Sequence, residues 1–112
     1  MEYVLLIHAD EAKWADATED DRKGMYAAHQ EFATALAEAK VPMKGGAELA
    51  GSATGAVVRG YADATVTDGP FTEAREQLGG FYVIDVPTRE DAIAWAKRLP
   101  ADIVEVRATV QQ

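Results

Sequence analysis

The fold is decided by Glu-Tyr-Val-Leu-Leu-Ile-His at residues 2–8 and by Phe-Tyr-Val-Ile-Asp-Val at residues 81–86. A β-strand alternates its side chains between two faces, and in both stretches each face is mostly apolar. Strands of that kind are covered on both sides inside a folded protein. The two stretches are therefore predicted to be the central strands of a sheet.

The remaining elements follow from start and stop signals along the chain. Thr18-Glu19-Asp20-Asp21 is a capping-box pattern that predicts a helix to Lys40, and Thr88-Arg89-Glu90-Asp91 predicts a second helix to about Arg98. A loop carrying Trp14 is expected before the first helix. Shorter strands are predicted through Leu49 after Gly45-Gly46, in a hairpin over 55–67, and over 103–110.

The resulting order is β-α-β, hairpin, β-α-β, which predicts one α+β domain over residues 1–112 with the ferredoxin-like split βαβ topology. Two helices cover only one face of a four-stranded sheet, so the other face would leave apolar side chains in water. Either the inserted hairpin folds over this face or a second copy covers it in a two-fold dimer. The size of the apolar patch favours the dimer.

Composition excludes several classes of protein. The formal net charge is −8, with 11 basic and 19 acidic residues, and a surface of this sign repels nucleic acids. The chain has no cysteine, which rules out disulfides and thiolate metal sites. It has no apolar run near the length of a membrane span and no secretory signal, so a cytoplasmic location is expected.

Two residues are the candidates for catalysis. His29 falls on the apolar stripe of the first predicted helix with Met25, Phe32 and Leu36, and imidazole titrates closest to neutral pH. Asp10 follows the first strand, where a carboxylate can orient an imidazole or act as a general acid or base. The structural alternative is a core histidine satisfied by one hydrogen bond and an acid that shapes a loop.

His8, Asp68, Phe71 and Tyr82 are the candidates for substrate binding, and each also has a structural interpretation. His8 lies on a central strand; Asp68-Gly69-Pro70-Phe71 is a turn with favourable chemistry; Tyr82 can line a pocket or pack in the core. The spacing of the two histidines and the acids matches no metal motif, and no phosphate-binding loop is present. No metal and no cofactor are therefore expected.

The chain resembles the YCII-related family, specifically the branch named for its DGPF motif. The matching segments are Tyr3–Glu11, Asp68–Glu73, Glu76–Tyr82, Ala92–Ala96, Leu99-Pro100 and Val104–Arg107. The resemblance implies a dimeric α/β barrel, similar in fold to muconolactone isomerase, and it implies that His29 and Asp10 form an active-site dyad. His8 departs from the family pattern, because relatives often carry an aromatic residue there.

Three functions are consistent with these residues. The first is a small-molecule enzyme with lyase-like or isomerase-like proton-transfer chemistry, since a few relatives are linked to dehydrochlorination of chlorinated hydroxyquinols. The second is a non-catalytic ligand-binding or regulatory module with a sigma factor as partner, since other relatives are encoded beside sigma factors. The third is a structural domain whose histidine and aspartate satisfy each other.

Overall fold

The centre of the molecule is a four-stranded antiparallel sheet with the order β2-β5-β1-β6. The structure, a computed structural model, describes residues 1–111. The strands are β1 (Glu2–Asp10), β2 (Met43–Glu48), β5 (Glu76–Asp85) and β6 (Ile103–Ala108). The two strands predicted to be central, β1 and β5, are central, and the α+β class with a four-stranded sheet and a hairpin is confirmed.

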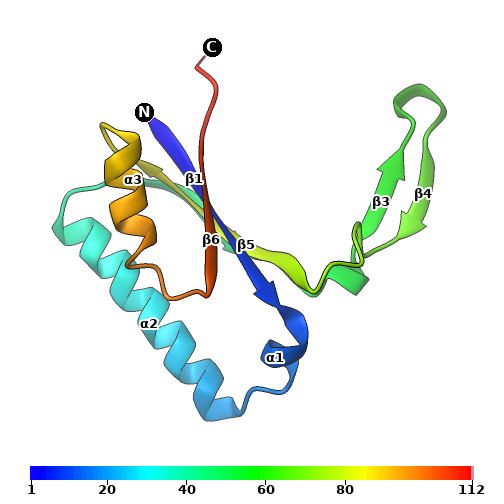
Figure 1. The fold of residues 1–112 in the computed structure, drawn as a ribbon, viewed down its shortest axis with the longest axis horizontal. Coiled ribbons are helices and arrows are strands. Elements are labelled where there is room, and N and C mark those ends of the chain that lie inside the picture. Colours follow the sequence, from blue (N-terminus) through cyan, green and yellow to red (C-terminus); the bar gives the residue numbers. More distant parts are fainter. Residues whose placement is uncertain (112) are drawn as a thin grey trace.

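Two longer helices lie on the same face of this sheet (Figure 1). Helix α2 (Glu19–Glu38) begins with the predicted capping box, which Thr18 and Asp21 form. Helix α3 (Arg89–Ala96) is capped by Thr88, whose side chain accepts a hydrogen bond from the Asp91 backbone. The side chains between helices and sheet form the core: Tyr3, Leu5, Phe32, Leu36, Ile84, Val86, Ala92 and Leu99. Among residues 1–111, no helix is both long and apolar enough to cross a membrane.

Some predicted boundaries were wrong. The segment after β1 is a short helix, α1 (Glu11–Ala15), because the Asp10 carboxylate accepts a hydrogen bond from the Ala12 backbone and caps it. Strand β5 begins at Glu76, several residues earlier than expected. Its glycines obscured the pattern: the pairing of β1 with β5 shifts register between Ile7 and His8, which leaves Gly79 as a bulge inside the strand.

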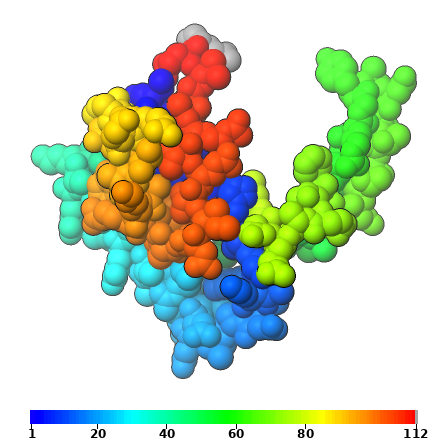
Figure 2. Space-filling model, in the orientation of Figure 1, coloured from blue at the N-terminus to red at the C-terminus, as the bar shows by residue number. Residues whose placement is uncertain are grey.

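The predicted hairpin forms, but it does not fold over the open sheet face. Strands β3 (Ala56–Arg59) and β4 (Thr65–Asp68) make a separate two-stranded sheet, joined through the short 3-10 helix η2 (Tyr61–Asp63). This hairpin, called the arm below, projects away from the body of the molecule (Figures 1 and 2). In β3 and β4 only Val57 is even partly buried.

The face of the main sheet opposite the helices carries an apolar surface. Alternation and register place six apolar side chains there: Val4, Leu6, Leu78, Phe81, Val83 and Ile103. We call this set the open sheet face. Leu78 and Ile103 are 40% and 43% exposed, and the other four are partly exposed.

Candidate functional site

His29 faces the sheet because of its position along α2. The capping box fixes where the helix begins, and residues 29, 32 and 36 then fall on one side of it. Phe32 and Leu36 are buried on that side, whereas His29 is only partly buried. Its Nδ1 atom lies 2.8 Å from the hydroxyl oxygen of Tyr82. The two rings are almost parallel, with 5.9 Å between centroids and 17° between planes.

Tyr82 reaches His29 because the neighbouring strand has no side chain beneath its ring. Tyr82 pairs with Gly46 of β2, and a Cβ atom at Gly46 would lie 3.3 Å from the Cδ1 atom of Tyr82. Phe32 packs against the ring at 5.3 Å between centroids. A glycine on β2 and an aromatic residue on α2 therefore hold the phenol in place.

Burial changes the pKa of both side chains in the His29–Tyr82 pair. It lowers the pKa of His29, while the Pro100 carbonyl and the Glu48 carboxylate act in the opposite direction more weakly. Burial also raises the pKa of Tyr82. Both shifts favour the neutral form of the side chain. At neutral pH the pair is accordingly an unprotonated imidazole beside a protonated phenol.

A second pair of polar side chains lies next to the first. Tyr26, one turn before His29 on α2, donates its hydroxyl to Glu48, with both carboxylate oxygens at 3.1 Å. The hydrogen bond to Glu48 raises the pKa of Tyr26, with smaller contributions from burial and from the charge of Glu48. Trp14 of α1 packs edge-on against the Tyr26 ring at 5.9 Å. Tyr26 and Glu48 were not among the predicted site residues, because their contact joins a helix to the end of an edge strand.

Asp10 does not join His29 within the chain. Its Oδ1 atom accepts the α1 capping bond, and its Oδ2 atom lies 4.0 Å from the Nε atom of Arg75. Over residues 1–111, no hydrogen bond or ion pair connects Asp10 with His29. The reason is strand alternation, because Tyr3, Leu5 and Ile7 face the helices and Asp10 has the opposite parity.

His8 also lies on the side away from the helices, and it pairs with an acid. Its Nε2 atom is 3.0 Å from the Oε1 atom of Glu105 on β6. Arg107 lies beside the same carboxylate, with 3.8 Å from its Nε atom to Oε2. The two histidines of the chain therefore belong to opposite faces of the sheet.

Asp68 and Phe71 lie at the root of the arm, outside the His29 cluster. Asp68 ends β4 and is exposed, and the Phe71 side chain is 75% exposed under the guanidinium of Arg59, 5.8 Å from its ring centroid. Between them, the Gly69 N–H donates to the Gly55 carbonyl at 2.7 Å. This conspicuous turn of the sequence therefore fastens the arm.

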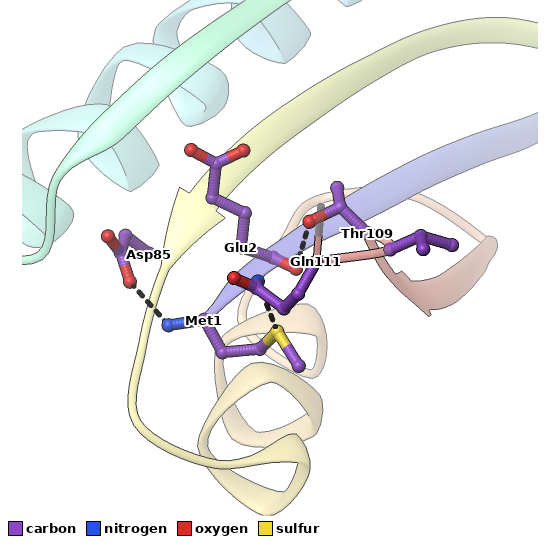
Figure 3. A pocket seen from close by; sticks show the side chains of 6 residues that line it. Met1, Glu2, Asp85, Thr109 and Gln111 are labelled. Atoms are coloured by element: carbon purple, nitrogen blue, oxygen red, sulfur yellow. Dashed lines mark hydrogen bonds and ion pairs between the residues drawn. The ribbon is translucent and has the colours of Figure 1, made fainter.

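Two shallow grooves lie elsewhere. One, of about 290 Å³, is lined by both chain ends near Met1, Asp85 and Gln111; there the Met1 amino group binds the Asp85 carboxylate at 3.0 Å (Figure 3). The other, of about 440 Å³, runs between α3 and β6 along Ile93 and Val106. Neither groove is lined by His29 or Tyr82. Over residues 1–111, no group of three or more metal-ligating side chains gathers.

Known proteins show which family the chain belongs to. The model of the YCII-related domain matches residues 1–110. The chain belongs to the YCII-related family. An uncharacterized protein of Rhizobium meliloti (strain 1021) is 41% identical over 54 residues, which is 47% of this chain and 44% of that protein. The chain thus matches less than half the length of that relative, whose name assigns it no activity.

Proposed function

We propose that this YCII-related chain is a small-molecule enzyme of the lyase or isomerase type, in which His29 and Tyr82 transfer the proton. The observation that supports the proposal is the 2.8 Å contact between His29 Nδ1 and the Tyr82 hydroxyl. An imidazole that is neutral at pH 7 can accept a proton, and a phenol that keeps its proton can donate one. The pair provides both roles at adjacent atoms.

Each step of such a reaction has a residue to perform it. When a small organic substrate binds, the Tyr82 hydroxyl turns from His29 Nδ1 to the substrate oxygen on which negative charge develops, and Nδ1 takes the proton from the acidic C–H bond. Returning the proton to a different carbon gives isomerisation, whereas loss of a leaving group gives elimination. The Glu48 charge, held by Tyr26, stabilises the imidazolium while His29 carries the proton.

Asp10 is given a structural role and not a catalytic one. The dyad of His29 with Asp10 is replaced within one chain by the pair of His29 with Tyr82, since Asp10 caps α1. Asp10 and His8 have the parity of the open sheet face, and Asp68 and Phe71 lie at the arm. We assign these four residues to contacts outside the proton-transfer step.

The proposed enzyme is a two-fold homodimer of the DGPF branch, assembled as an α/β barrel. Six apolar side chains on the open sheet face support this assembly, because a water-exposed patch of that kind is uncommon on a monomer. Pairing the faces across a two-fold axis covers both patches with one contact. Asp68-Gly69-Pro70-Phe71 supports the branch.

The test is hydrogen–deuterium exchange into the acidic C–H bonds of a panel of small cyclic ketones, enones and lactones, followed by proton NMR. Wild-type protein is expected to accelerate exchange for at least one compound, and His29→Gln to abolish the acceleration. His8→Gln is the matched control and retains it, because His8 lies on the other face. Equal rates for wild type and His29→Gln would remove the proposal.

The second candidate is a non-catalytic module that acts with a sigma factor. It is favoured by one observation, namely that His29 lines neither of the two grooves described above, the one beside Met1 and Asp85 and the one between α3 and β6. Co-elution with a purified sigma factor encoded beside the gene, together with an absence of exchange activity across the panel, would replace the enzyme with this module.

A further inference from the structure

Two exposed valines lie side by side on the arm, and nothing in residues 1–111 covers them. In the register of the arm Val58 lies opposite Val66, so these two side chains share one face, with Ala56 and Asp68 on the same face nearer the root. The other face carries Val57, Arg59, Thr65 and Thr67. Val58 and Val66 are 64% and 66% exposed. The two valines form a small apolar patch on one face of the arm.

The arm is fixed at its root and unsupported along its length. At the root, the Glu11 carboxylate accepts hydrogen bonds from both the backbone N–H, at 2.8 Å, and the hydroxyl of Ser52 in the short 3-10 helix η1 (Ser52–Thr54). Gly69 packs so tightly there that a Cβ atom would overlap the Ser52 carbonyl oxygen. Beyond the root, an isolated two-stranded hairpin is at best marginally stable in water.

The chain exposes more surface than a compact monomer of its mass. The chain exposes 7841 Å², whereas a compact monomer of its mass exposes about 6,000 Å², an excess of about 1,800 Å². A stable protein–protein contact takes about 800 Å² from each partner. The radius of gyration is also large, 15.8 Å against about 13 Å for a compact domain of this length, because the arm projects from the body. The excess exceeds what a stable dimer needs.

We propose that the arm is the clasp of a homodimer, and that its Val58–Val66 face packs on a second copy of this chain. The second copy sits in the notch between arm and body that Figure 2 shows, against the open sheet face. A second copy fits because each chain carries two exposed apolar surfaces, the Val58–Val66 face of the arm and the open sheet face. A two-fold axis buries both surfaces of both chains in one contact. This inference rests on the dimer proposed above and adds the element that holds it together.

Two neighbouring substitutions test the clasp by analytical ultracentrifugation. Val66→Asp places a charge on the apolar face, and Thr65→Asp places the same charge on the opposite face, next to Arg59. Both positions are exposed in the single chain, so neither substitution disturbs its core. Wild type and Thr65→Asp are expected at about 24 kDa, twice the 12.1 kDa of one chain. Val66→Asp is expected to raise the dimer Kd at least about tenfold, because an unpaired charge would be buried.

The outcomes separate the clasp from the other proposals. A dimer that Val66→Asp and Thr65→Asp weaken equally, or not at all, overturns the clasp and leaves the sheet-face dimer in place. A wild type that is monomeric at 100 μM overturns both. The proton-exchange assay on His29 is read independently, so its failure is distinguishable from either result.

A spin label gives a second measurement that does not depend on weakening the dimer. The chain has no cysteine, so Arg59→Cys on the polar face of the arm provides a single attachment point. Mixed dimers of this labelled chain with a ¹⁵N-labelled wild-type chain are expected to lose amide signals at Val4, Leu6 and Phe81 of the ¹⁵N chain. A dimer whose open sheet face keeps full signal intensity would overturn the clasp.

Discussion

The two adjacent glycines of β2 give a sharp test of how Tyr82 is positioned. An added Cβ at Gly46 would lie 2.9 Å from the Phe81 carbonyl oxygen and 3.3 Å from Tyr82 Cδ1. At Gly45, on the opposite face of the same strand, the nearest atom would be Val83 Cγ2 at 3.8 Å, an ordinary contact. Gly46→Ala is therefore expected to strain the sheet beside the His29–Tyr82 pair, whereas Gly45→Ala is its matched control.

The expected difference in stability between Gly46→Ala and Gly45→Ala can be estimated, because one contribution is common to both variants and cancels. Replacing glycine by alanine restricts the unfolded chain and adds about 0.4–1 kcal/mol of stability in either variant. Only Gly46→Ala also forces a methyl group against backbone, and overpacking of this kind typically costs about 1–3 kcal/mol. The shared contribution cancels, so Gly46→Ala is expected to be less stable than Gly45→Ala by about 1–3 kcal/mol.

Urea unfolding followed by circular dichroism measures this difference, at one protein concentration because self-association adds to apparent stability. The midpoint of Gly46→Ala is expected to lie about 1 M below that of Gly45→Ala. The His29 ring signals should move only in Gly46→Ala, because the displaced phenol no longer meets the imidazole. Identical midpoints and unchanged His29 signals in the two variants would refute the role assigned to Gly46.

Three further predictions follow from single residues. Gly24→Ala is expected to raise the free energy of unfolding by about 0.5–1 kcal/mol, because Gly24 is inside α2 and a methyl group there meets no atom within 4 Å; an unchanged urea midpoint would contradict this. Gly69→Ala is expected to loosen the arm by pushing the Ser52 carbonyl away, which amide exchange in β3 and β4 would report, and unaltered protection there would count against it. Burial lowers the pKa of His29, so between that folded pKa and about 6.5 the unfolded chain binds more protons and stability falls as the pH falls, with no further loss from His29 below the folded pKa. The part of the acid-side loss that His29→Gln abolishes is the measured contribution, and parallel stability profiles of wild type and variant would contradict the assignment.

The sequence was most informative where local chemistry alone sets the structure. Thr18 and Asp21 marked the start of α2 because a capping box satisfies backbone N–H groups within one turn. The apolar character of β1 and β5 on both faces identified the central strands. The boundary of β5 was missed because Gly79 forms a bulge, and a bulge interrupts the alternation by which a strand is detected.

The position of His29 was predictable, but its contact was not. His29 was predicted to lie on the side of the first long helix that faces the sheet, and it lies there. Its partner was expected to be Asp10. Strand alternation gives Asp10 the parity of the open sheet face, and its carboxylate caps α1. Tyr82 was chosen as a possible pocket residue, and its contact with His29 depends on Gly46, which lies 36 positions away in the chain.

The sequence by itself determined the class of the fold, the central strands, the starts of α2 and α3 and the presence of a hairpin, because each depends on periodicity or on hydrogen bonds within a few residues. Only the tertiary structure decided that the hairpin projects as an arm and that His29 meets Tyr82 and not Asp10. These features depend on which distant surfaces come together, and that choice is made by strand register and by the space that Gly46 and Gly69 leave for neighbouring backbone and side chains.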